Sequence, residues 1–416
     1  MPEIAIRSTG ESAPLAAAEL LRPRQRLVLQ ALTWSSGLTR TELAERLGLP
    51  KATLAGLVDS LVAAGLVIEE PSSFELGPPG VAGASGLAGA PGIAGGPGAP
   101  GAALGRRVGR PPRLLRLAGP VPATGAVVYS GGVLSAAVVS YAGEVRGRAA
   151  IVLGHRDIDE ALVSAGLQVL EEARGRAPGA PVISSVVLGV PAPLGLVAPD
   201  LVLQLERRAG MTALVENDAN LGALGEAIFG AGQGIDTFLY VKLARNVGAG
   251  LIVGGRLHRG ATGYAGELGH VQVRDDGPLC VCGGRGCLHG LLGDALVQAV
   301  QPAYERALSF RDVLDLAANG ESGPRRVLED TGRTLGRPLA DFATLFNPEA
   351  IVVDGSFAPA VGYVIAGIRA SLERYTAPVA GAAVSVISGA LGDDADLLGA
   401  AALARGVVPS AAVAPA

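Results

Sequence analysis

The chain has 416 residues, of which 49% are hydrophobic and 17% charged, so it is long enough for two or three domains with buried cores. Its net charge of −4 excludes a globally basic nucleic-acid coat, and no segment has the ~20 apolar residues that a membrane span needs. The N-terminal residues lack the pattern of a secretory signal, so we expect a cytoplasmic protein with no membrane partner. The first 120 residues carry 12 Lys and Arg against 9 Asp and Glu, which is compatible with a separate nucleic-acid-binding module.

The segment from Pro23 to Val67 has the apolar periodicity of helices. Thr39 precedes a short helical stretch, and Glu42 three residues later completes the signature of a capping box. The link Leu-Gly-Leu-Pro at residues 47–50 ends this helix and starts the next one. Two short helices joined in this way predict a helix-turn-helix. The alternative is a three-helix unit for packing or dimerisation.

Two short apolar segments flank an unusual repeat. Residues 66–70 and 113–117 are expected to form the two strands of a wing. Between them, glycine occurs at every third position from 77 to 101, which is the collagen period. A repeat of this length is too short to form a good triple helix. We therefore interpret residues 77–103 as a disordered insertion at the wing tip. The predicted winged helix-turn-helix domain covers residues 19–118.

The predicted recognition helix runs from Lys51 to Ala64 and exposes few groups that could contact base edges. A basic cluster before the second wing strand adds charge where a wing would meet phosphates, although a solvated linker explains it nearly as well. The residues expected to contact DNA are Arg40, Lys51, Thr53, Arg106, Arg107 and Arg110.

From Thr124 onward, apolar strands alternate with helical segments, which indicates an α/β fold. A hairpin is expected at residues 126–139 around paired glycines, and buried strands at 182–190 and 350–355. The ends of such strands are where α/β folds bind ligands.

All three cysteines of the chain lie close together after one histidine. His270 is followed by Cys280, Cys282 and Cys287, with glycines that let the loop turn tightly. One imidazole and three thiolates form the donor set of a closed structural zinc site. The sequence therefore predicts zinc as a structural cofactor, with a reactive or incidental thiol cluster as the alternative.

Two further segments carry carboxylates at turns. Residues 216–220, Glu-Asn-Asp-Ala-Asn, lie between a predicted strand and a helix, where a carboxylate could deprotonate a hydroxyl. The alternative is a helix N-cap, a position that Asn and Asp often occupy. Residues 263–270 form a glycine-rich loop that places Glu267 beside the predicted metal ligand His270, and an ordinary flexible turn is the alternative there.

Together these motifs resemble the ROK family of repressors and sugar kinases. The resemblance implies an α/β protein with an actin-like ATPase fold, in which two lobes enclose a sugar site, over residues 121–406. The matching segments are the winged head and residues 109–112, 189–191, 216–220, 266–270, 280–287, 347–353 and 392–400.

The resemblance also assigns roles to individual residues. Asp218 stands where the kinases have their catalytic base, and Asn217, Glu267 and His270 match positions that bind sugar hydroxyls. His270 is expected to face both ways, with one ring nitrogen on zinc and the other toward the ligand. His289 is included in the predicted effector site, but it stands where the family has a sugar-binding glutamate. This departure leaves open an unusual sugar, a phosphorylated sugar or no ligand.

The phosphate-binding segments depart from the family pattern. Tyr129 replaces an aspartate, Val133 replaces a threonine, and Ala-Arg-Asn at residues 244–246 replaces a Gly-Thr-Gly turn. Phosphoryl transfer depends on cradling the phosphates and Mg²⁺. We therefore predict no kinase activity and regard Asp218 as a vestigial base.

These features predict a DNA-binding transcriptional regulator, a repressor, that responds to a sugar or sugar derivative. Its expected partners are operator DNA, the sugar and further copies of the chain in a homodimer or homotetramer. One alternative is an ATP-dependent hexose kinase with a regulatory head. The other is a ligand-blind protein that binds DNA constitutively or acts as a scaffold.

Overall fold

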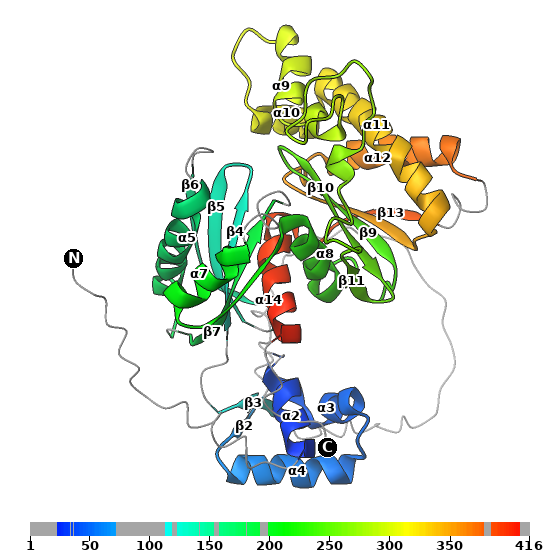
Figure 1. Cartoon of the computed structure of the whole chain (residues 1–416). Helices are drawn as coiled ribbons and strands as arrows, with labels where there is room; N and C mark the ends of the chain where they lie inside the picture. Colours follow the sequence, from blue (N-terminus) through cyan, green and yellow to red (C-terminus); the bar gives the residue numbers. More distant parts are fainter. Residues whose placement is uncertain are drawn as a thin grey trace, which may run out of the picture. The chain divides into compact units, whose positions relative to one another are not determined.

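The computed structural model describes residues 23–33, 35, 37–71, 113–118, 123–140, 142–153, 158–179, 181–191, 199–377 and 384–407 (Figure 1). The chain divides into two compact units, residues 1–119 and residues 120–416, called the head and the body below. The glycine repeat and the basic residues Arg106, Arg107 and Arg110 lie outside the described residues. Within those residues, no helix combines the length and the apolar character required to cross a membrane.

The head combines short helices with a small antiparallel sheet of strand order β1-β3-β2. Strands β2 and β3 pair with Val67 opposite Leu117, which confirms the two predicted wing strands. Strand β1 was not predicted. The elements of the head are α2 (Pro23–Thr33), β1 (Leu38–Thr39), α3 (Arg40–Leu47), α4 (Lys51–Ala63), β2 (Val67–Pro71) and β3 (Arg113–Leu117).

The ends of helix α3 follow the local sequence. The Glu42 amide donates to Thr39 Oγ1 at 3.2 Å, and Glu42 Oε2 accepts from the Thr39 amide at 2.8 Å, which confirms the capping box. Gly48 ends the helix in the left-handed region at φ 62°, a conformation that glycine adopts without strain. Helix α4 then begins at Lys51, because Pro50 is still extended with ψ at 139°.

The core of the head is built from one face of each helix and the central strand. The apolar periodicity of residues 23–67 predicts Leu27 and Val62 on the buried faces of their helices, but Leu27 is 47% exposed and Val62 is 37% exposed. At 100° per residue, each neighbours a buried position and points past the edge of the core. The most buried core residues are Val28, Leu32, Leu43, Leu54, Val58, Leu61 and Leu115.

The first sheet of the body has the order β6-β5-β4-β7-β8. Strands β4 and β5 form the predicted hairpin, which turns at Gly131 and Gly132 with φ of 59° and 85°. Strands β4, β7 and β8 are parallel. The strands are β4 (Ala123–Ser130), β5 (Val133–Ser140), β6 (Val145–Val152), β7 (Ile183–Val190) and β8 (Thr212–Asn217).

The second sheet has the order β11-β10-β9-β12-β13 and combines an antiparallel half with parallel pairs around β12. Every residue of the predicted strand β12 is buried, including Asp354, which follows its apolar run from Ala350 to Val353. The strands are β9 (Phe238–Leu243), β10 (Val247–Val253), β11 (Arg256–His258), β12 (Ala350–Gly355) and β13 (Ser385–Ser388).

Helices cover both faces of each sheet, and two of them lie between the sheets (Figure 1). The first sheet is covered on its far face by α5 (Ile158–Gly175) and α7 (Pro199–Ala209), and the second by α11 (Ser322–Phe346) and α12 (Val361–Tyr375). The smaller elements are α9 (Asp294–Val300), α10 (Phe310–Ala318) and the 3₁₀ turns η2 (Leu268–His270), η3 (Leu288–Leu291), η4 (Gln301–Ala303) and η5 (Gly392–Asp394).

The two helices between the sheets are α8 (Asp218–Phe229) and α14 (Ala395–Val407). They touch backbone to backbone, because a Cβ atom on Gly225 would collide with the Ala395 carbonyl and one on Gly399 with the Leu221 carbonyl. Helix α8 also packs on the second sheet and α14 on the first. The pair therefore joins the two halves of the body, and both helices begin at the site described next.

Candidate effector and metal site

The predicted Glu-Asn-Asp segment lies where strand β8 passes into helix α8. Asn217 caps this helix, since its side-chain oxygen accepts the Asn220 amide at 3.0 Å. The N-cap alternative is therefore confirmed for Asn217. Glu216 accepts from Asn220 Nδ2 at 2.9 Å and forms an ion pair with Arg259 at 2.7 Å. These contacts fix the junction between β8 and α8. Asp218, the residue after Asn217, therefore lies in the first turn of α8.

Asp218 is 9% exposed, and its side chain forms polar or charged contacts with residues of two other elements, β4 and β9. Its Oδ2 atom accepts from Ser130 Oγ at 3.0 Å and from Lys242 Nζ at 2.8 Å. The same ammonium group donates to Asp396 Oδ2 at 2.8 Å. Asp218 and Asp396 stand in the first turns of α8 and α14, where the helix dipoles favour negative charge. Lys242 thus bridges two carboxylates at two helix N-termini.

The glycine-rich loop brings Glu267 near the same place. Gly266 adopts φ 90°, and a Cβ atom there would collide with the Ala249 carbonyl, so the turn requires glycine. The pKa of Glu267 is raised, mainly because the carboxyl group is buried and also because of the negative charge of Asp218. The neighbouring His270 opposes this shift. The Asp218 charge acts on Glu267, so the two residues are near enough to interact electrostatically, and their binding of one ligand stays a prediction.

The two histidines of the predicted effector site lie side by side. The rings of His270 and His289 are parallel within 11°, with centroids 5.9 Å apart. Burial lowers the pKa of His289, and the neighbouring His270 lowers it further. Both effects favour the neutral imidazole of His289, which offers one hydrogen-bond donor and one acceptor.

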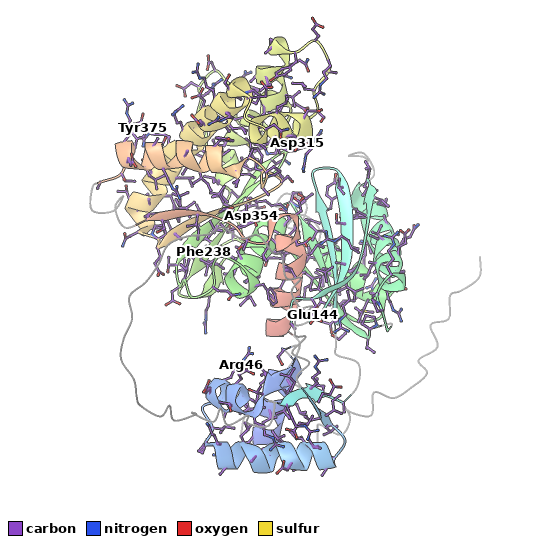
Figure 2. The ribbon with its side chains drawn as sticks, turned by 180° about the vertical axis from the view of Figure 1, so that it is seen from behind. Arg46, Glu144, Phe238, Asp315, Asp354 and Tyr375 are labelled. Atoms are coloured by element: carbon purple, nitrogen blue, oxygen red, sulfur yellow. The ribbon has the colours of Figure 1, made fainter. Side chains whose placement is uncertain are left out.

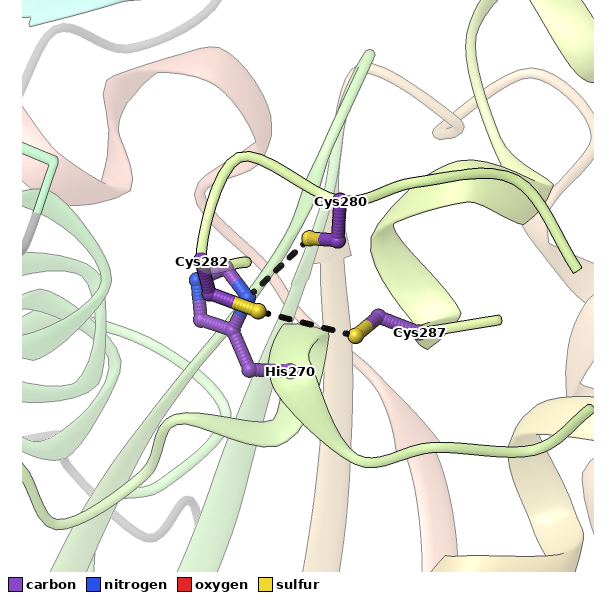
Figure 3. Close-up of side chains that lie close together, drawn as sticks. All are labelled: His270, Cys280, Cys282 and Cys287. Atoms are coloured by element: carbon purple, nitrogen blue, oxygen red, sulfur yellow. Dashed lines mark hydrogen bonds between the residues drawn. The ribbon is translucent and has the colours of Figure 1, made fainter. Parts of the chain in front are cut away.

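Figure 3 shows the predicted metal ligands gathered around one point. Cys280 Sγ lies 3.4 Å from His270 Nδ1, Cys282 Sγ lies 3.7 Å from Cys287 Sγ, and all four ligand atoms lie within 4.8 Å of one another. A zinc ion with Zn–S bonds of about 2.3 Å separates its sulfur ligands by about 3.8 Å. The donor set and its spacing therefore fit zinc.

The loop geometry explains why these cysteines converge. Gly283 and Gly286 take φ of 86° and 66°, and short bridges pair Gln272 with Cys287 and Leu279 with Arg285. Burial raises the pKa of Cys287 to about 11, whereas the Gly284 amide lowers the pKa of Cys282. When bound, zinc would stabilise the thiolates and cross-link the loop. His270 directs Nδ1 to this cluster and Nε2 to Glu267 at 3.7 Å, as expected for a residue that faces both ways.

The segments that depart from the kinase pattern lie at two strand turns. Tyr129 is buried near the end of β4, and Val133 begins β5 with 40% exposure. In the turn from β9 to β10, the Ala244 amide donates to the Asn246 carbonyl at 3.0 Å, and the Arg245 side chain between them is exposed.

The described DNA-contact candidates occupy different environments in the head. Lys51 is exposed at the start of α4, whereas Thr53 is half-buried. Arg40 forms ion pairs with Asp59 at 2.8 Å and Glu69 at 3.1 Å, so it links α3 to α4 and β2. A DNA contact by any of the three stays a prediction.

Sequence analysis missed several polar residues of the body. Ser130, Lys242 and Asp396 surround Asp218, and Arg259 holds Glu216. The sequence did offer one indication that Lys242 is unusual. It is one of only two lysines among the 34 basic residues, and it lies within an apolar strand pattern. Its two carboxylate partners are distant in sequence, and nothing local to them indicated the pairing.

The fold and the site define a sugar-kinase-like α/β body joined to a winged-helix head. A model described as "ROK family" matches residues 136–407 and one described as "MarR family" matches residues 21–73. The chain belongs to the ROK family, and its body has the actin-like ATPase fold of that family.

Known relatives include both regulators and kinases. The chain is 32% identical to a xylose repressor of Bacillus spizizenii over 201 residues, which are 48% of this chain and 52% of the repressor. It thus spans about half the length of that relative. A ROK glucokinase from Streptomyces griseus, solved with glucose and AMPPNP, has 29% identity and a TM-score of 0.61, over 68% of this chain and 99% of its own. A ROK transcriptional regulator described as a homologue of Escherichia coli Mlc shares the fold at 22% identity and a TM-score of 0.64, over 93% of this chain and 98% of its own.

Proposed function

We propose that this chain is a transcriptional repressor whose affinity for operator DNA is controlled by a sugar bound in the ROK domain. The proposal rests on one observation: a MarR-type winged-helix domain and a ROK domain occur in the same polypeptide chain. A sugar kinase has no need of such a head, whereas a regulator needs both parts. The related protein named xylose repressor supports this proposal, because its name joins a sugar to repression.

The effector site supports an uncharged sugar as ligand. Asn217, Glu267 and His270 supply hydrogen-bonding groups of both kinds. The one arginine bound at this junction, Arg259, is already paired with Glu216. A neutral polyol matches such a set better than a phosphorylated sugar, which needs positive charge.

The body is proposed to bind sugar without phosphorylating it. Phosphoryl transfer depends on cradling the phosphates and Mg²⁺, and the turns at Tyr129 and Arg245 depart from the phosphate-binding pattern of the kinases. Turnover of ATP with a sugar, abolished by Asp218→Asn, would instead establish the kinase alternative.

Zinc and self-association complete the proposal. Zinc at His270, Cys280, Cys282 and Cys287 would hold the loop that carries Glu267 and His289. A homodimer or homotetramer would present several heads to a symmetric operator. The sugar can release DNA only if it binds one arrangement of the body better than the other.

The test is binding of the purified full chain to DNA from upstream of its own gene. D-xylose, D-glucose and N-acetyl-D-glucosamine are added one at a time, and a coupled ATP-consumption assay is run on the same samples. DNA binding released by one sugar, without ATP consumption, is the expected result. DNA binding that no sugar changes would support the ligand-blind alternative, and sugar-dependent ATP consumption would support the kinase.

A further inference from the structure

Lys242 occupies an unusual position for a charged side chain. It lies on strand β9, is 9% exposed, and is the one basic residue among the buried polar residues of the described part of the chain. Burial alone would lower the pKa of Lys242, but the charges of Asp218 and Asp396 outweigh it and raise the pKa. The ammonium group is therefore a permanent part of this cluster.

The hydrogen bonds of Asp218 can be assigned atom by atom. Oδ1 accepts the Ala219 amide at 3.0 Å, while Oδ2 accepts from both Ser130 and Lys242. A carboxylate oxygen has two lone pairs, so Oδ2 is fully occupied. A ligand hydroxyl that approaches Oδ2 must therefore displace one of these two donors.

The two donors to Oδ2 differ in strength. Lys242 is charged, buried and bound to a second carboxylate, Asp396, whose Oδ1 accepts the Leu397 amide at 2.9 Å. Ser130 is a neutral hydroxyl, half-buried at the end of β4 beside the Gly131–Gly132 turn. Charge-assisted hydrogen bonds are the stronger kind, so Ser130 is the donor that leaves first. A sugar hydroxyl is the same chemical group and can replace it directly.

We propose that Ser130 competes with the bound sugar for Asp218, while Lys242 and Asp396 position that carboxylate to receive the sugar hydroxyl. This inference rests on the proposed sugar-binding function and adds three residues to its site. Ser130 weakens sugar binding, because a sugar hydroxyl that binds Asp218 Oδ2 has to break the Ser130 hydrogen bond. Lys242 and Asp396 are positioning residues that act through Asp218.

The decisive variant is Ser130→Ala in the full chain. Calorimetric titration with D-xylose, D-glucose and N-acetyl-D-glucosamine, one at a time, should show about tenfold tighter binding of the effective sugar, because no internal hydrogen bond is lost. A purely structural role of Ser130 would weaken binding instead. Ser184→Ala is the matched control, since Ser184 is a half-buried serine of the same sheet that donates to the Ala123 carbonyl. It should leave the affinity unchanged.

The positioning residues are tested by the double variant Lys242→Met with Asp396→Asn, which removes one positive and one negative charge and so keeps the net charge of the cluster. Its sugar affinity should fall at least about tenfold while circular dichroism shows a folded protein. Unchanged or weaker sugar binding by Ser130→Ala overturns the competition, even if the double variant fails to fold. Absence of binding by every sugar, to the parent and to Ser130→Ala alike, overturns the proposed function and this inference together.

Discussion

Asp354 and Glu226 place two carboxyl groups against each other in the interior of the body, with 4% and 0% exposure. Glu226 accepts the backbone amides of Ala231, Ala390 and Leu391. Asp354 stands on β12 within the second sheet (Figure 2), and its Oδ2 atom has no hydrogen-bond partner among the described residues. Burial and the neighbouring Glu226 raise the pKa of Asp354 to about 8.

The raised pKa of Asp354 makes stability depend on pH. Between about pH 4 and the folded pKa of about 8, the unfolded chain releases this proton while the folded chain keeps it, so the free energy of unfolding falls as pH rises. Asp354→Asn removes this loss, and it should stabilise the protein by up to about 5 kcal/mol at pH 8 and by little at pH 4. Urea unfolding at both pH values measures the difference. Asp276→Asn, an exposed control, should show no such trend, and a stabilisation by Asp354→Asn that is equal at both pH values would contradict the assignment.

Glu226 is expected to be a structural residue of the body. Glu226→Ala leaves three backbone amides without their acceptor and should destabilise the protein by about 3 kcal/mol. Thermal unfolding of the parent and the variant measures this loss. Glu373→Ala, on the exposed side of α12, is the control and should change stability by less than about 0.5 kcal/mol. A similar small change in both variants would show that water or other groups satisfy these amides.

The metal site should couple to the effector site through His270. Cys282→Ser should lower the zinc content of the purified protein and weaken sugar binding together, because the loop that carries Glu267 loses its cross-link. Elemental analysis and sugar titration measure the two effects. Val281→Ser changes an 82% exposed neighbour in the same loop and should alter neither. Complete loss of zinc with full sugar affinity would disprove the coupling.

Lys51 should contribute to DNA binding through phosphate contact. Lys51→Ala should weaken binding across DNA sequences and reduce the slope of log affinity against log salt by about one. Filter binding over a range of salt concentrations measures both. Arg311→Ala on helix α10 of the body also removes an exposed positive charge and is the control. An unchanged salt slope in Lys51→Ala would place the DNA elsewhere on the head.

Features that depend on neighbouring residues could be predicted from the sequence. The Thr39 capping box needs only a residue three positions away, and the zinc ligands lie within one loop. The motif at Asn217 and Glu267 was recognised through family resemblance. In contrast, Lys242 and Asp396 are 154 residues apart, and only the packing of α14 against α8 brings them together. No local pattern encodes such a contact, which is why the cluster around Asp218 was missed.

The backbone contact between α8 and α14 restricts how the body can move. Packed helices normally slide past one another through small adjustments of interlocking side chains, but no such side chains separate Gly225 and Gly399 from the opposite backbone. We therefore expect the two helices to move together as one rigid unit, with the first sheet packed on α14 and the second on α8. A displacement of Asp218, at the start of α8, is expected to be transmitted through this unit to both sheets instead of being absorbed by side-chain repacking.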